Sequence, residues 1–125
     1  MKNKYEEISD ELEYGDISDE KAINICNNLL KKSLTENDDV VLESIFNAVF
    51  NGVDNREIAS KLYLEDVVKN ILNYNEECLD YLISILAYTG KEEYRDVLIK
   101  LKSSDYDLDI DEALNELDYR IHKNK

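Results

Sequence analysis

The densest group of possible metal ligands lies between residues 105 and 116. Asp105, Asp107, Asp109 and Asp111 alternate along the chain, and Glu116 follows them. Counted from Asp105, these carboxylates stand at positions 1, 3, 5, 7 and 12 of the segment. Carboxylate oxygens at such intervals suit calcium, because Ca²⁺ takes roughly six to eight oxygen ligands. A calcium-responsive protein that uses residues 105–116 is therefore one hypothesis for this chain.

The spacing of these acids is similar to that of an EF-hand loop, but two residue types differ. The sixth position of an EF-hand is a glycine at a sharp turn, and here it is Ile110, which does not readily adopt a positive φ. The eighth position is apolar in an EF-hand and is Glu112 here. These departures favour a simpler interpretation, an acidic loop followed by the capped start of a helix.

Other residues that could carry chemistry do not form a known catalytic pattern. The sequence contains no glycine-rich phosphate loop, no His-Glu-x-x-His motif and no nucleophile elbow. His122 is the only histidine, and one histidine without clustered cysteines cannot build an ordinary zinc site. Cys26 and Cys78 each lie among apolar neighbours, which predicts two buried, reduced thiols. We therefore expect no enzymatic activity, no cofactor and no metal ion.

The charge of the chain limits its partners. The 125 residues include 29 acidic and 15 basic side chains, which gives a formal net charge of −14. Such a charge repels nucleic-acid phosphates and anionic membrane surfaces, so we expect neither as a partner. It favours solubility, and it also steers a basic protein toward the chain. No apolar run approaches the roughly 20 residues of a membrane span, and no signal-peptide core is visible, so we expect a cytoplasmic location.

Helical periodicity predicts an all-α fold of about six helices. The chain has no proline and only three glycines, which suits helices separated by short turns. We expect an acidic N-terminal lead-in over residues 1–17 and one helical domain over residues 18–125. Ser18 is the expected N-cap of the first helix, Gly52 and Gly90 are expected stops, and Asp54 or Asn55 is expected to cap the third segment. That third segment is expected to break near residues 63–64, where the apolar register slips.

The second and fourth predicted helices repeat with an offset of 38 residues. Val41, Ile45 and Gly52 align with Leu79, Ile83 and Gly90. The sixth helix repeats the apolar pattern at an offset of 35 residues, as in the alignment of residue 79 with 114. A period near this length with two helices per unit is typical of an α-solenoid. An irregular helical bundle is the alternative architecture.

One junction of the sequence resembles a known repeat family. Residues 78–91 look like the second helix and turn of a HEAT-like repeat, and residues 94–98 look like the first helix of the next repeat. The resemblance extends over residues 18–122 as three antiparallel hairpins. It implies a short α-solenoid in which the second, fourth and sixth helices line one surface.

The polar faces of these three helices form the predicted partner-binding surface. They combine acids with tyrosines, which supply contact area and a hydroxyl for hydrogen bonding. Tyr81 and Tyr88 could equally pack between hairpins, and the sequence leaves both roles open. The predicted partner-binding residues are Asp39, Glu43, Asn47, Glu77, Asp80, Tyr81, Ser84, Tyr88, Asp111, Glu112, Glu116 and Tyr119.

These observations favour a protein-binding module that captures a basic protein. The chain also resembles the immunity proteins of bacterial polymorphic-toxin systems, which are small and acidic and in some cases helical or HEAT-like. This resemblance implies that the chain neutralises a cognate basic toxin, such as a nuclease, by masking it with an acidic surface. A HEAT-like structural or adaptor protein is the alternative of a different class.

Overall fold

The computed structural model describes residues 3–103 and 106–123, and every regular element within these ranges is helical. The prediction of an all-α fold is therefore confirmed. The model has one more α-helix than the six predicted, because the N-terminal segment also folds into a helix. The elements are α1 (Lys4–Tyr14), α2 (Asp19–Ser33), α3 (Asp39–Asn55), η1 (Ala59–Lys61), α4 (Glu65–Lys69), η2 (Ile71–Asn73), α5 (Glu76–Tyr88), η3 (Glu92–Tyr94), α6 (Arg95–Lys102) and α7 (Ile110–Lys123), where η denotes a 3₁₀-helix.

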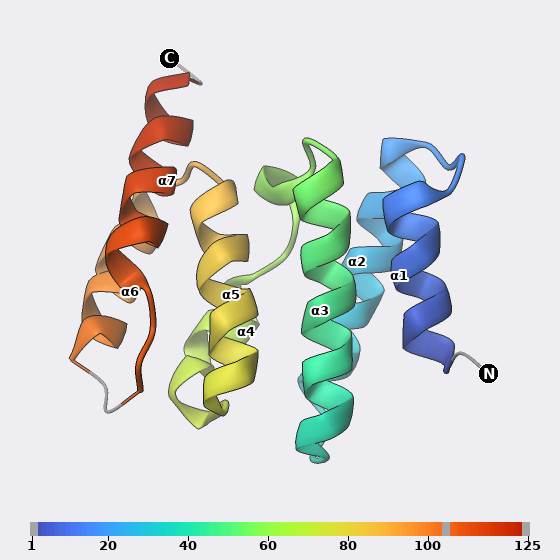
Figure 1. Ribbon diagram of the computed structural model, residues 1–125, viewed down its shortest axis with the longest axis horizontal. Coiled ribbons are helices and arrows are strands. Elements are labelled where there is room, and N and C mark those ends of the chain that lie inside the picture. The colour runs from blue at the N-terminus through green and yellow to red at the C-terminus, as the bar shows by residue number, and fades with distance from the viewer. Residues whose placement is uncertain (1–2, 104–105, 124–125) are drawn as a thin grey trace.

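The helices form two layers (Figure 1). The front layer consists of α1, α3, α5 and α7, which stand side by side in chain order and run in the same direction. Each of these helices packs against the next one in the layer. The rear layer consists of α2, α6 and the short elements between residues 59 and 73, together with η3. The chain therefore passes through the rear layer between each front helix and the next.

Each front helix begins at an Asn or Asp side chain that caps its first turn. Asn3 accepts a hydrogen bond from the backbone N–H of residue 6, and Asp38 accepts from those of residues 40 and 41. Asn75 accepts from the N–H of residue 78, and Asp109 from that of residue 112. Such caps satisfy N–H groups that have no partner inside the helix. The caps of α3 and α5, Asp38 and Asn75, lie 37 residues apart, one residue fewer than the 38-residue offset predicted from the aligned apolar residues and glycines.

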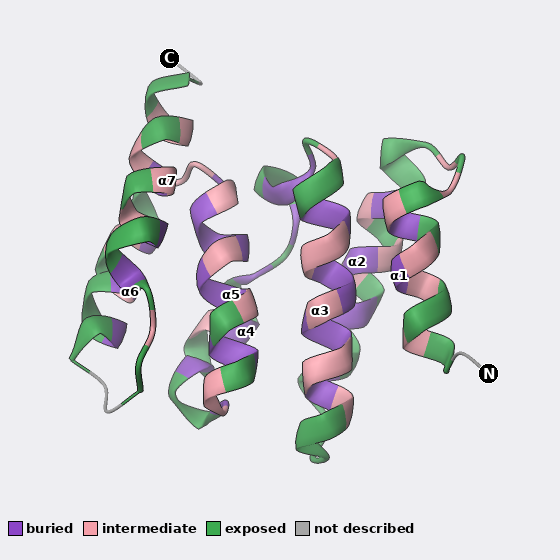
Figure 2. Ribbon diagram, viewed as in Figure 1, coloured by how far each residue is buried: buried purple, intermediate pink, exposed green. Residues whose placement is uncertain are grey.

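The core lies between the layers and is centred on α3, which packs against α1, α2 and α5. Figure 2 shows buried residues in bands along α3 and α5. Phe46 of α3 is fully buried and meets the ring of Tyr74 edge to face, with 5.2 Å between the ring centroids. Cys26 and Cys78 are both fully buried free thiols, as predicted.

Two predicted helix boundaries around α3 are wrong. Gly52 does not end the helix, which continues to Asn55, so Asp54 and Asn55 lie inside α3 and do not cap the next segment. Gly52 instead provides close packing: a Cβ atom there would lie 3.1 Å from Cys26 Sγ. Gly90 does end α5, in the left-handed region at φ 64°, as predicted.

The other predicted boundaries are confirmed. Ser18 caps α2, because its hydroxyl accepts a hydrogen bond from the N–H of Lys21 at 3.1 Å. The third segment is broken into η1, α4 and η2, and residues 63 and 64 separate the first two. No helix in the described part of the chain is long and apolar enough to cross a bilayer.

The acidic N-terminal segment forms α1, and Arg56 binds the C-terminal end of this helix through hydrogen bonds. Leu12 of α1 is fully buried, and its backbone carbonyl accepts a hydrogen bond from Arg56 Nε at 3.1 Å. The two terminal nitrogens of the same guanidinium donate to the carbonyls of Gly15 and Ile17, at 3.1 and 2.8 Å. Arg56 thereby satisfies three carbonyls of the α1–α2 connection. The proposed boundary between a lead-in and a domain at residue 17 stays a prediction.

Candidate functional site

Charge is divided unevenly between the two layers. In the front layer, α1 carries five acidic side chains and one basic, α3 and α5 carry three acidic each and no basic, and α7 carries four acidic and two basic. In the rear layer, α2 carries two acidic and three basic side chains, and α6 carries one acidic and three basic. The short helix α4 carries two acidic side chains and one basic, η3 carries two acidic, and η1 carries one basic. The front helices therefore sum to −12 and the rear elements to +1.

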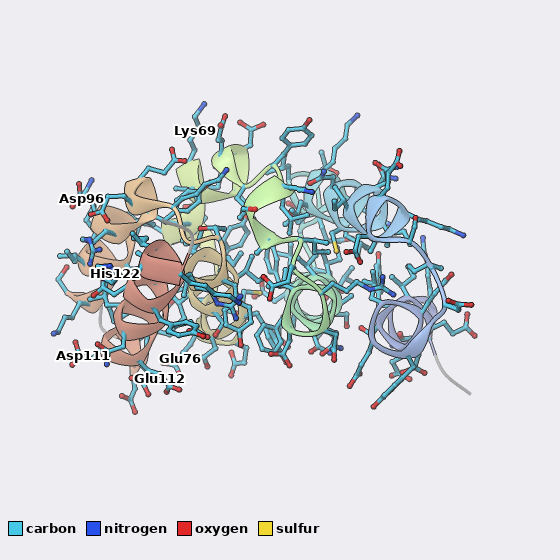
Figure 3. All side chains as sticks on the ribbon, turned by 90° about the horizontal axis from the view of Figure 1, so that it is seen from above. Lys69, Glu76, Asp96, Asp111, Glu112 and His122 are labelled. Atoms are coloured by element: carbon cyan, nitrogen blue, oxygen red, sulfur yellow. The ribbon has the colours of Figure 1, made fainter. Side chains whose placement is uncertain are left out.

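The outer faces of the two layers lie on opposite sides of the molecule. In Figure 3, which looks along the front helices, Glu112 points away from the front layer and Lys69 points away from the rear layer. The front helices therefore carry an excess of carboxylates, of which Asp111 and Asp118 pair with Lys102 and Arg95 of the rear helix α6.

A groove of about 220 Å³ lies between the last two helices of the front layer. Asp80, Ser84 and Tyr88 line it from α5, and Glu112 and Glu116 line it from α7. All five are among the predicted partner-binding residues. The remaining lining residues are Ile83, Ala87, Asp109 and Ala113. The groove therefore has an apolar floor and a polar wall that is rich in carboxylates.

Three of the four carboxylates of the groove have no basic partner among the described residues. None of Asp80, Asp109 and Glu112 has a described Lys, Arg or His nitrogen within 4.0 Å. Burial, followed by the charges of Glu76 and Glu77, raises the pKa of Asp80 above its ordinary value. A hydrogen bond with Asp109 is the main cause that raises the pKa of Glu112. The shift at Asp80 reflects lost hydration and repulsion between carboxylates, which a bound cation would relieve.

Tyr88 lies at the upper end of the groove, where α3, α5 and α7 meet. Its hydroxyl donates a hydrogen bond to Asp54 Oδ1 of α3 at 3.0 Å. The guanidinium of Arg120 from α7 lies 4.5 Å from the centroid of its ring. Arg120 also lies 3.6 Å from a carboxylate oxygen of Glu116 and 3.7 Å from one of Glu57. The guanidinium of Arg120 thus already lies among an aromatic ring and two carboxylates at this end of the groove.

Tyr81 and Tyr88, for which the sequence allowed either a packing role or a binding role, are neither fully buried nor fully exposed. Tyr81 and Tyr88 are both half-buried, and both rings lie beside Phe50 with 6.1 Å between centroids. Their packing fixes the ring planes, and their partial exposure leaves contact area at the surface. Tyr119 is far more exposed, at 59%, and lies outside the groove.

The structure does not bring the other predicted residues into the groove. Glu43 of α3 accepts a hydrogen bond from Asn75 Nδ2 at 3.0 Å and so supports the cap of α5. Asp111 pairs with Lys102 of α6 at 2.8 Å and is directed toward the rear layer. The remaining ones, which lie on the front helices away from the groove, are Asp39, Asn47, Glu77, Tyr81 and Tyr119.

The acidic segment 105–116 contributes to helix α7. Asp105 lies outside the described residues. Asp109 caps the helix, which begins at Ile110, and Glu116 is an internal residue of α7 in contact with Arg120. In the described ranges, no group of three or more His, Cys, Asp or Glu side chains is placed to hold a metal ion. The calcium hypothesis stays a prediction.

Comparison with known proteins gives no further assignment. The chain matches no protein-family model, no curated protein and no solved structure. The HEAT-like resemblance and the resemblance to immunity proteins therefore remain predictions, and the candidate site rests on the geometry and charge of the chain itself.

Three residues of the site escaped the sequence reasoning. Asp109 was considered as a loop acid and not as a groove residue. Arg120 stands four residues after Glu116, so the helical i,i+4 rule could have found their pairing. Asp54 gave no such signal, because its contact with the hydroxyl of residue 88 joins two helices separated by 34 positions.

Proposed function

We propose that the chain is a protein-binding module that captures a basic protein on its front layer. The observation that carries this proposal is the separation of charge, with −12 on the front helices and +1 on the rear elements. Carboxylates gathered on one face repel one another, and a basic partner relieves that repulsion when it binds. An acidic layer of this kind accelerates encounter with a basic protein, and salt weakens the attraction.

The groove between α5 and α7 is the proposed centre of the interface. Protein interfaces concentrate binding energy in a few well-packed residues, among which tyrosine and arginine are frequent. Tyr88 is held in place by Asp54, Phe50 and Arg120, so little side-chain entropy is lost when a partner covers it. Asp80 and Glu112, which have no basic partner among the described residues, line the same groove and can accept hydrogen bonds from a lysine or arginine of the partner.

The more specific proposal is an immunity protein that neutralises a cognate basic toxin, such as a nuclease. An acidic layer that competes with nucleic acid for the basic surface of a nuclease would block substrate entry directly. The test is co-expression with the product of a neighbouring toxin gene. Cells should survive only when the chain is present, and continued death despite a soluble, folded chain would contradict this version.

The location of the interface can be tested without knowing the partner. A capped hexa-arginine peptide is titrated into the ¹⁵N-labelled chain, and the amide shifts are mapped at low salt. Shifts should concentrate on residues 76–88 and 109–120 of the front layer and disappear at about 0.3 M salt, where the Debye length falls to about 6 Å. Shifts spread evenly over both layers would contradict a specific acidic face.

A further inference from the structure

A second groove lies in the rear layer, beside its shortest helices. The segment between α3 and α5 forms only one five-residue α-helix, α4, with a three-residue 3₁₀-helix on each side. The neighbouring α2 has 15 residues and α6 has eight. A helix as short as α4 cannot fill the space beside α6. A groove of about 220 Å³ remains between the 68–72 segment and α6.

The floor of this rear groove is apolar. Val68, Ile71 and Leu72 line it on one side, and Val97 and Leu101 line it on the other. Leu72 is 78% exposed and lies beside the other apolar residues of the groove. Covering this side chain would remove apolar surface from water, and that is the favourable term in most protein association.

The rim of the rear groove is basic. Lys69 and Lys100 are the only charged residues that line it. The nearest acid to Lys69 is Asp66, at 3.8 Å across an exposed pair, and Lys100 has no ion pair with a described residue. The chain as a whole has 29 acidic and 15 basic side chains. A groove lined by two lysines and no carboxylate therefore has the opposite sign of charge from the chain.

We propose that this rear groove docks an acidic amphipathic segment of a second partner protein. A leucine-like side chain of that segment packs against Leu72, Val97 and Leu101, and flanking carboxylates pair with Lys69 and Lys100. Recognition of this type, an apolar anchor in a groove with charged flanks, is common for short helical segments. The basic partner of the front layer is a poor occupant here, because its charge has the same sign as the rim.

The groove next to it supplies a matched control. That groove, of about 360 Å³, lies between α2 and α4 and is lined by Leu34, Tyr63 and Val67. Its charged lining residues are Lys31 and Asp66, so its rim carries no net charge. It offers a similar apolar floor without the basic rim, and charge complementarity therefore favours the groove beside α6.

The test uses a capped acidic peptide with leucines at helical spacing and glutamates between them, and a second peptide with lysines in place of the glutamates. Each is titrated into the full ¹⁵N-labelled chain. The acidic peptide should shift the amides of residues 68–72 and 97–101, and the basic peptide should not. Lys100→Glu and Lys69→Glu should each weaken acidic-peptide binding about tenfold, whereas Lys31→Glu should change it less than twofold.

Leu72→Ser provides a variant with little risk of unfolding, because the side chain is exposed. It should also weaken binding about tenfold. The proposal is overturned if the acidic peptide causes no shift in the rear groove at millimolar concentration. It is also overturned if both peptides bind there equally, or if Lys31→Glu weakens binding as much as Lys100→Glu.

Discussion

The hydroxyl of Tyr88 donates a hydrogen bond to Asp54 at 3.0 Å and so joins the end of α5 to the end of α3. The guanidinium of Arg120 covers the same ring from α7. One tyrosine therefore connects three of the four front helices at the upper end of the candidate groove. A partner that touches Tyr88 meets a side chain that the fold has already positioned.

Removal of the hydroxyl should weaken the connection between α3 and α5. Tyr88→Phe keeps the ring under Arg120 but loses the hydrogen bond, so we expect a loss of about 0.5–1 kcal/mol in the free energy of unfolding. Urea denaturation at pH 7 measures this loss. Tyr119→Phe is the control, because the side chain of Tyr119 is 59% exposed and its hydroxyl makes no hydrogen bond with a described residue. Equal losses in the two variants would show that the Asp54 contact contributes nothing.

Stability should decrease in alkaline solution through the buried thiols. Burial raises the pKa of Cys26 from 9.0 to about 12, so the unfolded chain loses this proton first as the pH rises. The protonated thiol of Cys26 contributes fully to the free energy of unfolding below pH 9, and this contribution is lost as the pH rises toward 12. The loss is no more than about 1.4 kcal/mol per pH unit. Burial raises the pKa of Cys78 to about 12 as well. Urea denaturation under reducing conditions between pH 8 and 10 measures the slope.

The same experiment on the Cys26→Ala, Cys78→Ala double variant isolates the thiols. Its stability should depend much less on pH over this range, whatever its absolute value. An unchanged slope would mean that other groups cause the alkaline loss.

The close approach of α3 to α2 at Gly52 should appear as a coupling between two substitutions. Gly52→Ala gains about 1 kcal/mol of helix propensity, but its Cβ would lie 3.1 Å from Cys26 Sγ. We expect little net change in the parent chain. In a Cys26→Ala background the sulfur is gone, and the same substitution should stabilise the chain by about 1 kcal/mol. Thermal or urea denaturation of the four variants measures the coupling, and identical effects in both backgrounds would contradict it.

Arg56 should be necessary for the attachment of α1. Arg56→Lys keeps the charge but cannot bond the carbonyls of Leu12, Gly15 and Ile17 together, so about 2–3 kcal/mol should be lost. Amide exchange in residues 5–14 should accelerate more than exchange in α5. Arg95→Lys is the control, since Arg95 pairs among the described residues with two exposed acids, Glu92 and Asp118. Uniform acceleration across the chain would contradict a local role.

Much of the fold could be predicted because it depends on local signals. Hydrophobic periodicity located α2, α3, α5 and α7, and the side chain of Ser18 marked a helix start in both sequence and structure. The register slip near residues 63–64 marked a real break, because apolar residues there no longer share one helical face. Gly90 ends a helix because a residue with a positive φ cannot continue a right-handed α-helix.

The errors came from contacts that the local sequence does not contain. Gly52 has the residue type of a helix stop, but its role depends on the sulfur of Cys26 in another helix. The acidic N-terminus shows little periodicity, yet Leu12 is fully buried and Tyr5 and Ile8 also pack against the core. Arg56 binds the carbonyl of Gly15, 41 residues away in the sequence, at the end of α1. Five acids and polar residues of the groove were predicted as members of a wider surface over three helices, whereas the contacts of Asp54 and Arg120 with Tyr88 depend on tertiary packing.

The most direct test of the acidic front layer compares two charge reversals that change the net charge equally. Asp80→Lys with Glu112→Lys alters the front groove, and Glu65→Lys with Asp96→Lys alters the rear layer. The affinity of each folded variant for the capped hexa-arginine peptide is measured by calorimetry at low salt. The account predicts that the front pair weakens binding at least tenfold and the rear pair less than threefold. Equal weakening by both pairs would show that net charge alone governs binding, and would contradict a dedicated front face.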